Sequence, residues 1–194
     1  MRSSYIQNNY GSVFENTVKT FLPQRCVELG VLDGYSTLAI ARGIRTASIL
    51  SAHLSHLHAY DLWDGYKYKH GRMEEVQGRL DGEELSQFVT LYKKDAYEVH
   101  NDYEQESVCF LHVDISNDGD TLNKIVEQWH TKLSMGGMLL FEGGSAERDE
   151  IEWMKKYNNK PIRPVIDSHE ILNKWYIYAT YNAFPSLSVF IRKG

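Results

Sequence analysis

Residues 25–37 read RCVELGVLDGYST, and this stretch decides the fold. A short apolar run, Arg25–Leu29, is followed closely by the glycines Gly30 and Gly34. The next residues, 36–42, have the composition of a helix that Gly43 would stop. The pattern predicts a strand, a tight glycine turn and a helix, which together form the opening unit of an α/β fold.

The alternation of strands and helices continues along the chain. Further strand candidates occupy 57–62, 88–92, 108–115 and 138–142. Apolar residues at helical spacing cover 13–22, 122–133 and 146–157, the last with Ser145 as N-cap. The final candidates, 174–180 and 187–192, lie too close for a crossover helix and should pair antiparallel. We expect a doubly wound, mostly parallel α/β sheet of seven strands with a C-terminal antiparallel hairpin.

The composition is typical of one globular domain. The 194 residues are 42% apolar and 24% charged, which argues against extensive disorder and coiled coil. We expect a single domain over 1–194, with an N-terminal helical extension over 1–24 and a polar insertion over 64–87 that forms a lid. The buried-type cysteines, Cys26 and Cys109, indicate a reducing compartment.

The charge and hydropathy patterns restrict the partners. A net charge of -5 argues against a broad electrostatic grip on nucleic acid or an anionic membrane. No stretch approaches the roughly 18 apolar residues of a membrane span, and the start of the chain is polar. We therefore expect a cytoplasmic protein with a small-molecule partner, and a homo-oligomer stays open.

Acidic residues follow the predicted parallel strands. In open parallel sheets, ligands bind beyond the carboxyl ends of the strands. The acids at or after those ends are Glu28, Asp33, Asp61, Asp95, Asp114 and Glu142. The sequence therefore predicts an acidic binding site along one edge of the sheet.

The glycine turn argues against a dinucleotide cofactor. A dinucleotide fingerprint needs Gly-x-Gly-x-x-Gly, but Leu32 stands where the second glycine would let a pyrophosphate approach. Like charges about 4 Å apart also repel by roughly 4 kcal/mol at an effective dielectric of 20. The acids favour a cationic nucleoside such as S-adenosylmethionine, with Asp61 for its ribose. The alternatives that stay open are an NAD-dependent oxidoreductase and a non-catalytic nucleotide-binding module.

These residues resemble the class I S-adenosylmethionine-dependent methyltransferases, in the small-molecule O-methyltransferase branch. The first motif of that branch is similar to VELGVxxGxS, and the resemblance runs from about Cys26 to the C-terminus. Its specific parts are residues 28–37 with Asp61, and the block from Asp114 to Gly137. It implies a Rossmann-like fold and methyl transfer to a hydroxyl of a small polar molecule, such as a sugar or a natural-product scaffold.

The resemblance also implies which residues hold the cofactor. They are Glu28, Gly30, Gly34, Ser36, Asp61, Leu62, Asp95 and Ala96. Glu28 and the two glycines would shape the methionine and ribose pocket, while Ser36 would cap the first helix. Asp61 would accept the ribose hydroxyls and Leu62 would pack on adenine, whose amino edge the last two residues would read.

Catalytic roles fall on the ends of the fourth and fifth strands. The implied reaction is an in-line displacement, with Asp114 as the base, Glu142 nearby, and His112 assisting if the strand end opens. Asp114 and Glu142 could also hold Mg²⁺. Relatives often carry a histidine where this chain has Asn117. Arg148 could anchor an acidic or sugar-like acceptor.

A histidine cluster offers a different metal site. His53, His56 and His58 precede Asp61, but their spacing differs from that of binuclear hydrolases. Histidines in such a position more often cap a helix and enter a strand. We expect no metal there.

Overall fold

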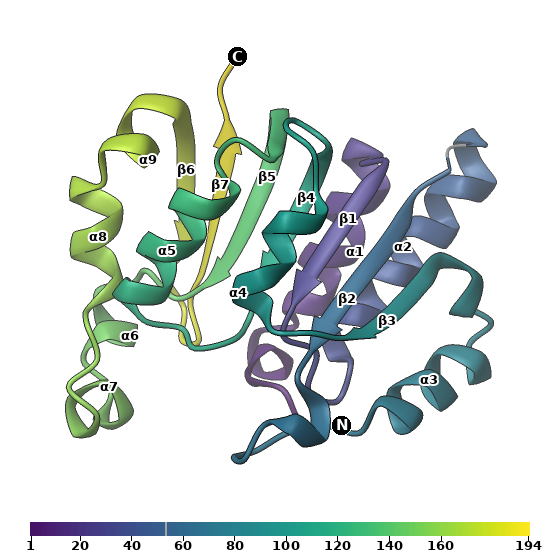
Figure 1. Ribbon diagram of the computed structural model, residues 1–194, viewed down its shortest axis with the longest axis horizontal. Coiled ribbons are helices and arrows are strands. Elements are labelled where there is room, and N and C mark those ends of the chain that lie inside the picture. Colours follow the sequence, from purple (N-terminus) through teal and green to yellow (C-terminus); the bar gives the residue numbers. More distant parts are fainter. Residues whose placement is uncertain (53) are drawn as a thin grey trace. The chain divides into compact units, whose positions relative to one another are not determined.

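The computed structural model describes residues 1–52 and 54–194. The chain divides into two compact units, Met1–Val99 and His100–Gly194. Each unit combines strands with helices, as Figure 1 shows. Among the described residues, no helix combines the length and the apolar character that crossing a bilayer requires. Both cysteines are free thiols; Cys26 is buried and Cys109 is partly exposed.

The first unit contains a parallel sheet in the order β3-β2-β1. Its strands are β1 (Arg25–Leu29), β2 (His56–Asp61) and β3 (Val89–Lys93). Its helices are η1 (Ser4–Asn8), α1 (Tyr10–Phe21), α2 (Tyr35–Ser51), η2 (Trp63–Gly65), α3 (Met73–Gly82), η3 (Ser86–Phe88) and α4 (Ala96–Val99). Parallel pairing brings the carboxyl ends of the three strands to one edge. Strand β1, the glycine turn and helix α2 follow one another as predicted.

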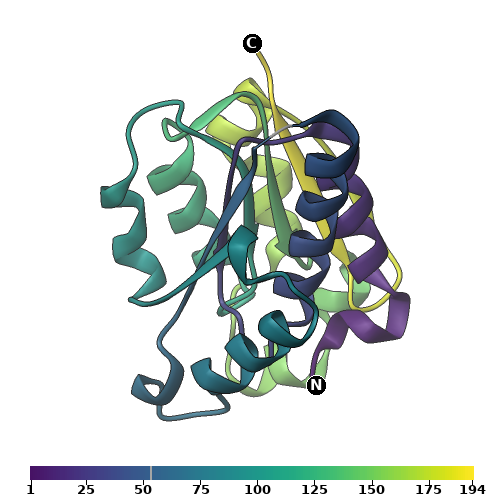
Figure 2. The same ribbon diagram turned by 90° about the vertical axis from the view of Figure 1, so that its right-hand side faces the viewer.

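The sequence suggested that helix α2 stops at Gly43, but it does not. It continues to Ser51, because Gly43 is the point at which α1 and α2 pack closely. A Cβ added there would lie 2.6 Å from the carbonyl oxygen of Glu15. The two helices lie side by side in both views of the ribbon (Figure 1 and Figure 2). The glycine therefore serves helix packing and not helix termination.

The polar segment 64–87 is folded onto the glycine turn. It contains α3, whose Val76 and Leu80 are fully buried. A Cβ on Gly34 would lie 2.9 Å from Val76, and Arg79 donates to the carbonyl oxygen of Asp33 at 2.9 Å. This segment thus packs directly over the turn. Its opening as a lid stays a prediction.

The second unit contains a mixed sheet in the order β4-β5-β7-β6. Its strands are β4 (Val108–Val113), β5 (Leu133–Glu142), β6 (Tyr176–Tyr181) and β7 (Leu187–Arg192). Its helices are η4 (His100–Asp102), α5 (Gly119–Trp129), α6 (Ala146–Asp149), α7 (Glu152–Lys156), α8 (Ile162–Ser168) and α9 (Glu170–Trp175). Strand β4 pairs parallel with β5, whereas β7 pairs antiparallel with both β5 and β6, which confirms the C-terminal hairpin.

Helix α5 has the apolar stripe that its sequence predicts. Leu122, Ile125, Val126 and Trp129 are all buried. Asp118 caps the helix by accepting the amide of Thr121 at 2.8 Å. The predicted range 122–133 runs too far, because Leu133 already belongs to β5.

The region between β5 and β6 differs most from the prediction. The helix expected over 146–157 is split into α6 and α7, although Ser145 caps α6 as predicted, accepting from the amide of Arg148 at 3.1 Å. Helices α8 and α9 were not predicted, and 174–175 end α9 instead of beginning a strand. Asp149 holds the start of α8, because its carboxylate accepts the amides of Ile162 and Arg163 at 2.7 and 2.8 Å.

Candidate functional site

The carboxylate of Asp61 organises the glycine turn of the first unit. Its Oδ2 accepts the amide N–H groups of Val31 at 2.8 Å and Leu32 at 3.0 Å. Its Oδ1 accepts the amide of Trp63 at 2.9 Å. A carboxylate has about four acceptor positions. One position on Oδ1 is therefore left over for another donor after these three bonds.

The backbone of the turn is specialised in two ways. Gly30 and Gly34 have φ values of 90° and 84°, a region that favours glycine, and Leu32 also has a positive φ of 52°. In addition, the amide of Gly30 donates to Tyr60 at 2.8 Å and that of Gly34 donates to Val31 at 2.9 Å. Together with the two amides bound to Asp61, most of the donors of this turn are engaged within the protein.

Glu28 and Ser36 lie beside the turn, at the end of β1 and the start of α2. Glu28 is fully buried and accepts the hydroxyl of Thr37 at 2.5 Å, which ties β1 to α2. Ser36 does not cap α2, contrary to the prediction. The N-cap position belongs to Gly34, whose αL backbone starts the helix with no side-chain bond. Ser36 is instead buried within the first turn of the helix.

Asp33 is paired with a residue near the start of the chain. Arg2 donates to it through the backbone N at 2.7 Å, Nε at 2.9 Å and Nη2 at 2.6 Å. These bonds hold the pKa of the Asp33 carboxyl well below its usual value, since they stabilise the ionised form. Arg2 also donates to the carbonyl oxygen of His70 at 3.0 Å. No local sequence signal announced this pair, which joins residues far apart in the chain.

The residues expected near adenine lie just after β2 and β3. Leu62 is half-buried, and Ala96 is buried at the start of α4. Asp95 accepts the amide of Tyr97 at 2.9 Å and so turns the chain into that helix. Trp63, for which the sequence suggested no role, is buried and donates its indole N–H to the carbonyl oxygen of Tyr92 at 3.0 Å. This side chain fixes the end of β2 against β3.

The described histidines of the cluster, His56 and His58, lie on β2 and have structural contacts. His53 lies outside the described residues. The Nε2 of His56 is 2.8 Å from the hydroxyl of Thr90, and burial lowers the pKa of both His56 and His58. Within 1–52 and 54–194, no group of three or more His, Cys, Asp and Glu side chains is placed to hold a metal ion.

In the second unit, Asp114 follows β4 and is oriented by an amide. The Nδ2 of Asn117 donates to Oδ1 of Asp114 at 2.7 Å. Asn117 is 6% exposed, and its own Oδ1 is buried with no hydrogen-bond partner among the described residues. Asn117 thus holds the carboxylate of Asp114 in one orientation.

Glu142 ends β5 and is paired with Arg148. The Nε of Arg148 lies 3.6 Å from Oε1 of Glu142, and both side chains are almost fully buried. The Nη2 of Arg148 donates to the carbonyl oxygen of Asn117 at 3.3 Å, and the guanidinium carbon lies 5.5 Å from the ring centre of Trp153. Nη1 of Arg148 is buried and has no hydrogen-bond partner in the part of the chain described.

His112 lies on β4, two residues before the predicted base. It is fully buried and is in register with Leu140 of β5. A buried ring does not exchange protons with an acceptor from solvent. Its assistance in catalysis therefore stays a prediction that requires the strand end to open.

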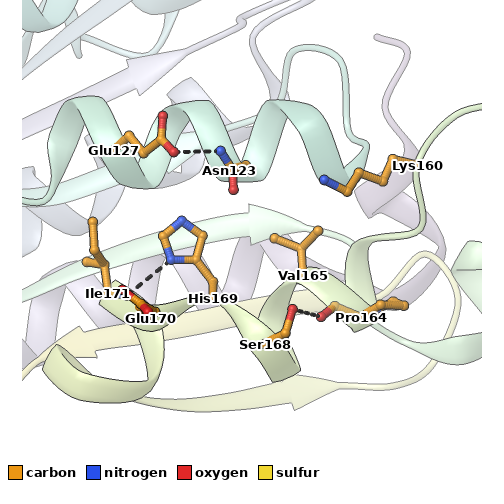
Figure 3. Close-up of a pocket in the computed structure, with 9 residues that line it drawn as sticks. All are labelled: Asn123, Glu127, Lys160, Pro164, Val165, Ser168, His169, Glu170 and Ile171. Carbon is orange, nitrogen blue, oxygen red and sulfur yellow. Dashed lines mark hydrogen bonds between the residues drawn. The ribbon is translucent and has the colours of Figure 1, made fainter.

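A hollow of about 410 Å³ lies between α5, α8 and α9 (Figure 3). None of the predicted site residues lines it. His169, at its wall, caps α9 by accepting the amide of Ile171 at 3.2 Å, and burial lowers its pKa. His169 therefore serves as the N-cap of α9.

A comparison with known proteins identifies a family for this chain. Residues 27–142 match a family model described as Methyltransferase domain. The uncharacterized protein y4gI of Sinorhizobium fredii (strain NBRC 101917 / NGR234) is 28% identical over 126 residues, which cover 64% of this chain and 13% of that protein. The chain therefore spans about 13% of the length of this curated relative.

Solved structures resemble the chain over nearly its whole length. The methyltransferase PaMTH1 of Podospora anserina, solved with SAH, has 19% identity and a TM-score of 0.71, covering 100% of this chain and 80% of its own. The O-methyltransferase TomG of Streptomyces achromogenes, solved with SAM, has 13% identity and a TM-score of 0.69, with 96% and 80% covered. An O-methyltransferase of Bacillus cereus, in complex with SAH, has 14% identity and a TM-score of 0.68, with 95% and 81% covered. This likeness confirms the Rossmann-like, doubly wound α/β fold.

Proposed function

The chain belongs to the family of methyltransferase domains, and we propose that it transfers the methyl group of S-adenosylmethionine to a hydroxyl of a small polar molecule. The observation that carries this proposal concerns the carboxylate of Asp61. It accepts hydrogen bonds from the amides of the glycine turn and of Trp63, and it keeps one further acceptor position. A ribose hydroxyl is the donor that such a position suits.

The same observation argues against a dinucleotide cofactor. Dinucleotide-binding turns hold a pyrophosphate on free backbone N–H groups at the start of a helix. Here the amides of Val31 and Leu32 already bind a carboxylate, which would also repel a phosphate. S-adenosylmethionine carries a sulfonium and an ammonium but no phosphate, so it meets neither obstacle.

The residues proposed for the cofactor are those of the glycine turn with Asp61, and those proposed for the acceptor are Asp114, Glu142 and Arg148. In-line displacement requires the acceptor oxygen at about 3–3.5 Å from the methyl carbon, opposite the sulfur. Asp114 would take the proton of the acceptor hydroxyl, because Asn117 holds its carboxylate in one orientation. Glu142 would act through Arg148, with which it is paired.

The residues at the ends of β4 and β5 do not suit Mg²⁺. The ion prefers an octahedral set of oxygen ligands. Of the two carboxylates expected to hold it, Glu142 lies 3.6 Å from the guanidinium of Arg148. That cation would repel a second one. We therefore expect EDTA to leave the rate of methyl transfer unchanged.

Calorimetry separates the proposed cofactor from its rival. We expect the purified chain to bind S-adenosylhomocysteine and to show no heat with NADH. Binding of NADH alone would contradict the proposal. A non-catalytic module would bind S-adenosylhomocysteine yet transfer no labelled methyl group to any acceptor of a broad hydroxylated panel. A cytoplasmic location, a homo-oligomer and a single functional domain stay predictions from the sequence.

A further inference from the structure

Leu32, in the glycine turn, has a strained backbone that needs contacts on both of its sides. Its φ of 52° lies in the left-handed region, which residues with a side chain rarely adopt and which persists only where surrounding contacts enforce it. Asp61 restrains the amide side of the turn, because its Oδ2 accepts the N–H groups of Val31 and Leu32. A contact on the carbonyl side would complete the restraint.

Gly71 supplies that contact. A Cβ added to Gly71 would overlap the carbonyl oxygen and carbon of Leu32, which are backbone atoms that cannot rotate away. Only glycine therefore lets the segment 64–87 approach the turn this closely. Arg79 of the same segment also donates to the carbonyl oxygen of Asp33 at 2.9 Å.

Arg2 ties this segment to the turn. It donates to both carboxylate oxygens of Asp33, and its Nη2 also donates to the carbonyl oxygen of His70 at 3.0 Å. The Asp33 side chain is only 9% exposed, and the bonds from Arg2 keep its pKa low, so the carboxylate is charged at neutral pH. Arg2 lies before the residues 27–142 that match the family model, so the match assigns it no role.

We propose that Arg2, His70 and Gly71 form a brace that fixes the glycine turn in the shape that binds the cofactor. Arg2 and Gly71 are then positioning residues, because they act through the turn and neither has to touch the cofactor. Asp33 serves as the anchor of the brace. This inference rests on the proposed methyl transfer, since it takes the glycine turn as the cofactor site.

The brace acts on affinity through the fraction of molecules whose turn has the binding shape. The apparent Kd of a ligand equals its intrinsic Kd divided by the fraction of the protein in the competent conformation. If the loss of a brace contact lowers that fraction to about one in ten, Kd rises about tenfold. This change corresponds to about 1.4 kcal/mol, which is close to the contribution of one hydrogen bond to a charged group.

Two arginine variants form the first test. Arg42 also makes a two-bond pair with a carboxylate, at 2.7 and 2.6 Å, but among its described contacts the guanidinium binds Glu83 and not the turn. In calorimetry, Arg2→Gln should bind S-adenosylhomocysteine about tenfold more weakly than the wild type, whereas Arg42→Gln should stay within twofold. Arg2→Lys keeps the charge but loses the planar fork, so its affinity should lie between those of the wild type and Arg2→Gln.

Two glycine variants test the close approach. Gly71→Ala places a methyl group against the Leu32 carbonyl, so the segment must move away and the affinity should fall at least tenfold. Gly78 lies on α3 of the same segment, and an added Cβ there meets nothing within 4 Å. Gly78→Ala should therefore bind S-adenosylhomocysteine within twofold of the wild type. If Gly71→Ala does not fold, the arginine variants decide the question.

Hydrogen exchange on the same samples shows whether the turn is held, because amide exchange reports local opening. The amides of residues 30–34 should exchange at least fivefold faster in Arg2→Gln and Gly71→Ala, and at the wild-type rate in Arg42→Gln and Gly78→Ala. The brace is refuted if Arg2→Gln and Arg42→Gln bind S-adenosylhomocysteine equally, or if exchange in the turn is the same in all variants.

The two measurements keep this inference apart from the proposed function. If the wild type binds S-adenosylhomocysteine and Arg2→Gln binds it equally well, the brace is wrong and the methyltransferase proposal stands. If the wild type does not bind S-adenosylhomocysteine, the proposed methyl transfer fails, and the exchange rates still decide whether Arg2 and Gly71 hold the turn.

Discussion

Replacing Asp61 with alanine should damage both the fold and the binding of the cofactor. The carboxylate accepts three backbone amides, at 2.8, 3.0 and 2.9 Å. Bonds to a charged acceptor contribute up to about 3 kcal/mol each, but Asp61 is only half-buried, so water replaces part of the loss. At about 1 kcal/mol a bond, the substitution costs about 3 kcal/mol of unfolding free energy.

Two measurements follow from that magnitude. For a chain of this size, 1 kcal/mol corresponds to roughly 2–4 °C, so the melting temperature should fall by about 6–12 °C. The affinity for S-adenosylhomocysteine should fall roughly tenfold to hundredfold, since the ribose loses a charged acceptor and the turn loses its support. The melting temperature and affinity of Asp61→Asn should lie between those of the wild type and Asp61→Ala. Its one carbonyl oxygen can still accept from Val31 and Leu32, whereas its NH₂ group faces the amide of Trp63, which is also a donor.

A neighbouring acid supplies the control. Asp64 is exposed and pairs with Lys93 on the surface, a kind of contact that contributes little to stability. Asp64→Ala should leave melting temperature and affinity unchanged. If Asp61→Ala melted and bound S-adenosylhomocysteine like the wild type, the role given to this carboxylate would be wrong.

Two further predictions concern stability. Gly43→Ala should lower the free energy of unfolding, measured in urea, by about 1–3 kcal/mol, because its Cβ meets the Glu15 carbonyl oxygen. Gly78→Ala, in open space on α3, should instead raise it by about 0.5–1 kcal/mol. Equal effects of the two substitutions would contradict the packing argument. The Arg2–Asp33 pair lowers the native pKa of Asp33, so its stabilisation is present above the ordinary aspartate value of about 3.9 and is lost as pH falls through the lower native pKa. The difference in unfolding free energy between the wild type and Arg2→Gln should therefore be larger at neutral pH than in strong acid, and a constant difference would argue against the pair.

The sequence predicted the elements whose signals are local. The strand β7 was placed at its observed bounds, and the turn before α2 was located from its two glycines. In each case the apolar run and its punctuating residues lie within a few positions of one another. The acids at the strand ends were found in the same way, from strand endings alone.

Features that depend on distant residues were not predictable. A glycine after an apolar helical run is a typical helix stop. The packing role of Gly43 becomes visible only because α1 lies against it. Tertiary contacts, which no spacing rule encodes, create the pairing of Arg2 with Asp33. They also leave buried polar atoms of Arg148 and Asn117 with no hydrogen-bond partner among the described residues.

The bonds between Asp61 and the turn also limit how this chain could change its cofactor. The carboxylate acts as a built-in substitute for a phosphate, so a Leu32→Gly change alone would widen the turn while its amides stayed occupied. Removing Asp61 alone would release the amides but also delete the ribose acceptor. A change to a phosphorylated cofactor, by evolution or by engineering, must therefore alter Leu32 and Asp61 together. A variant changed at only one of them would bind neither S-adenosylmethionine nor the phosphorylated cofactor well.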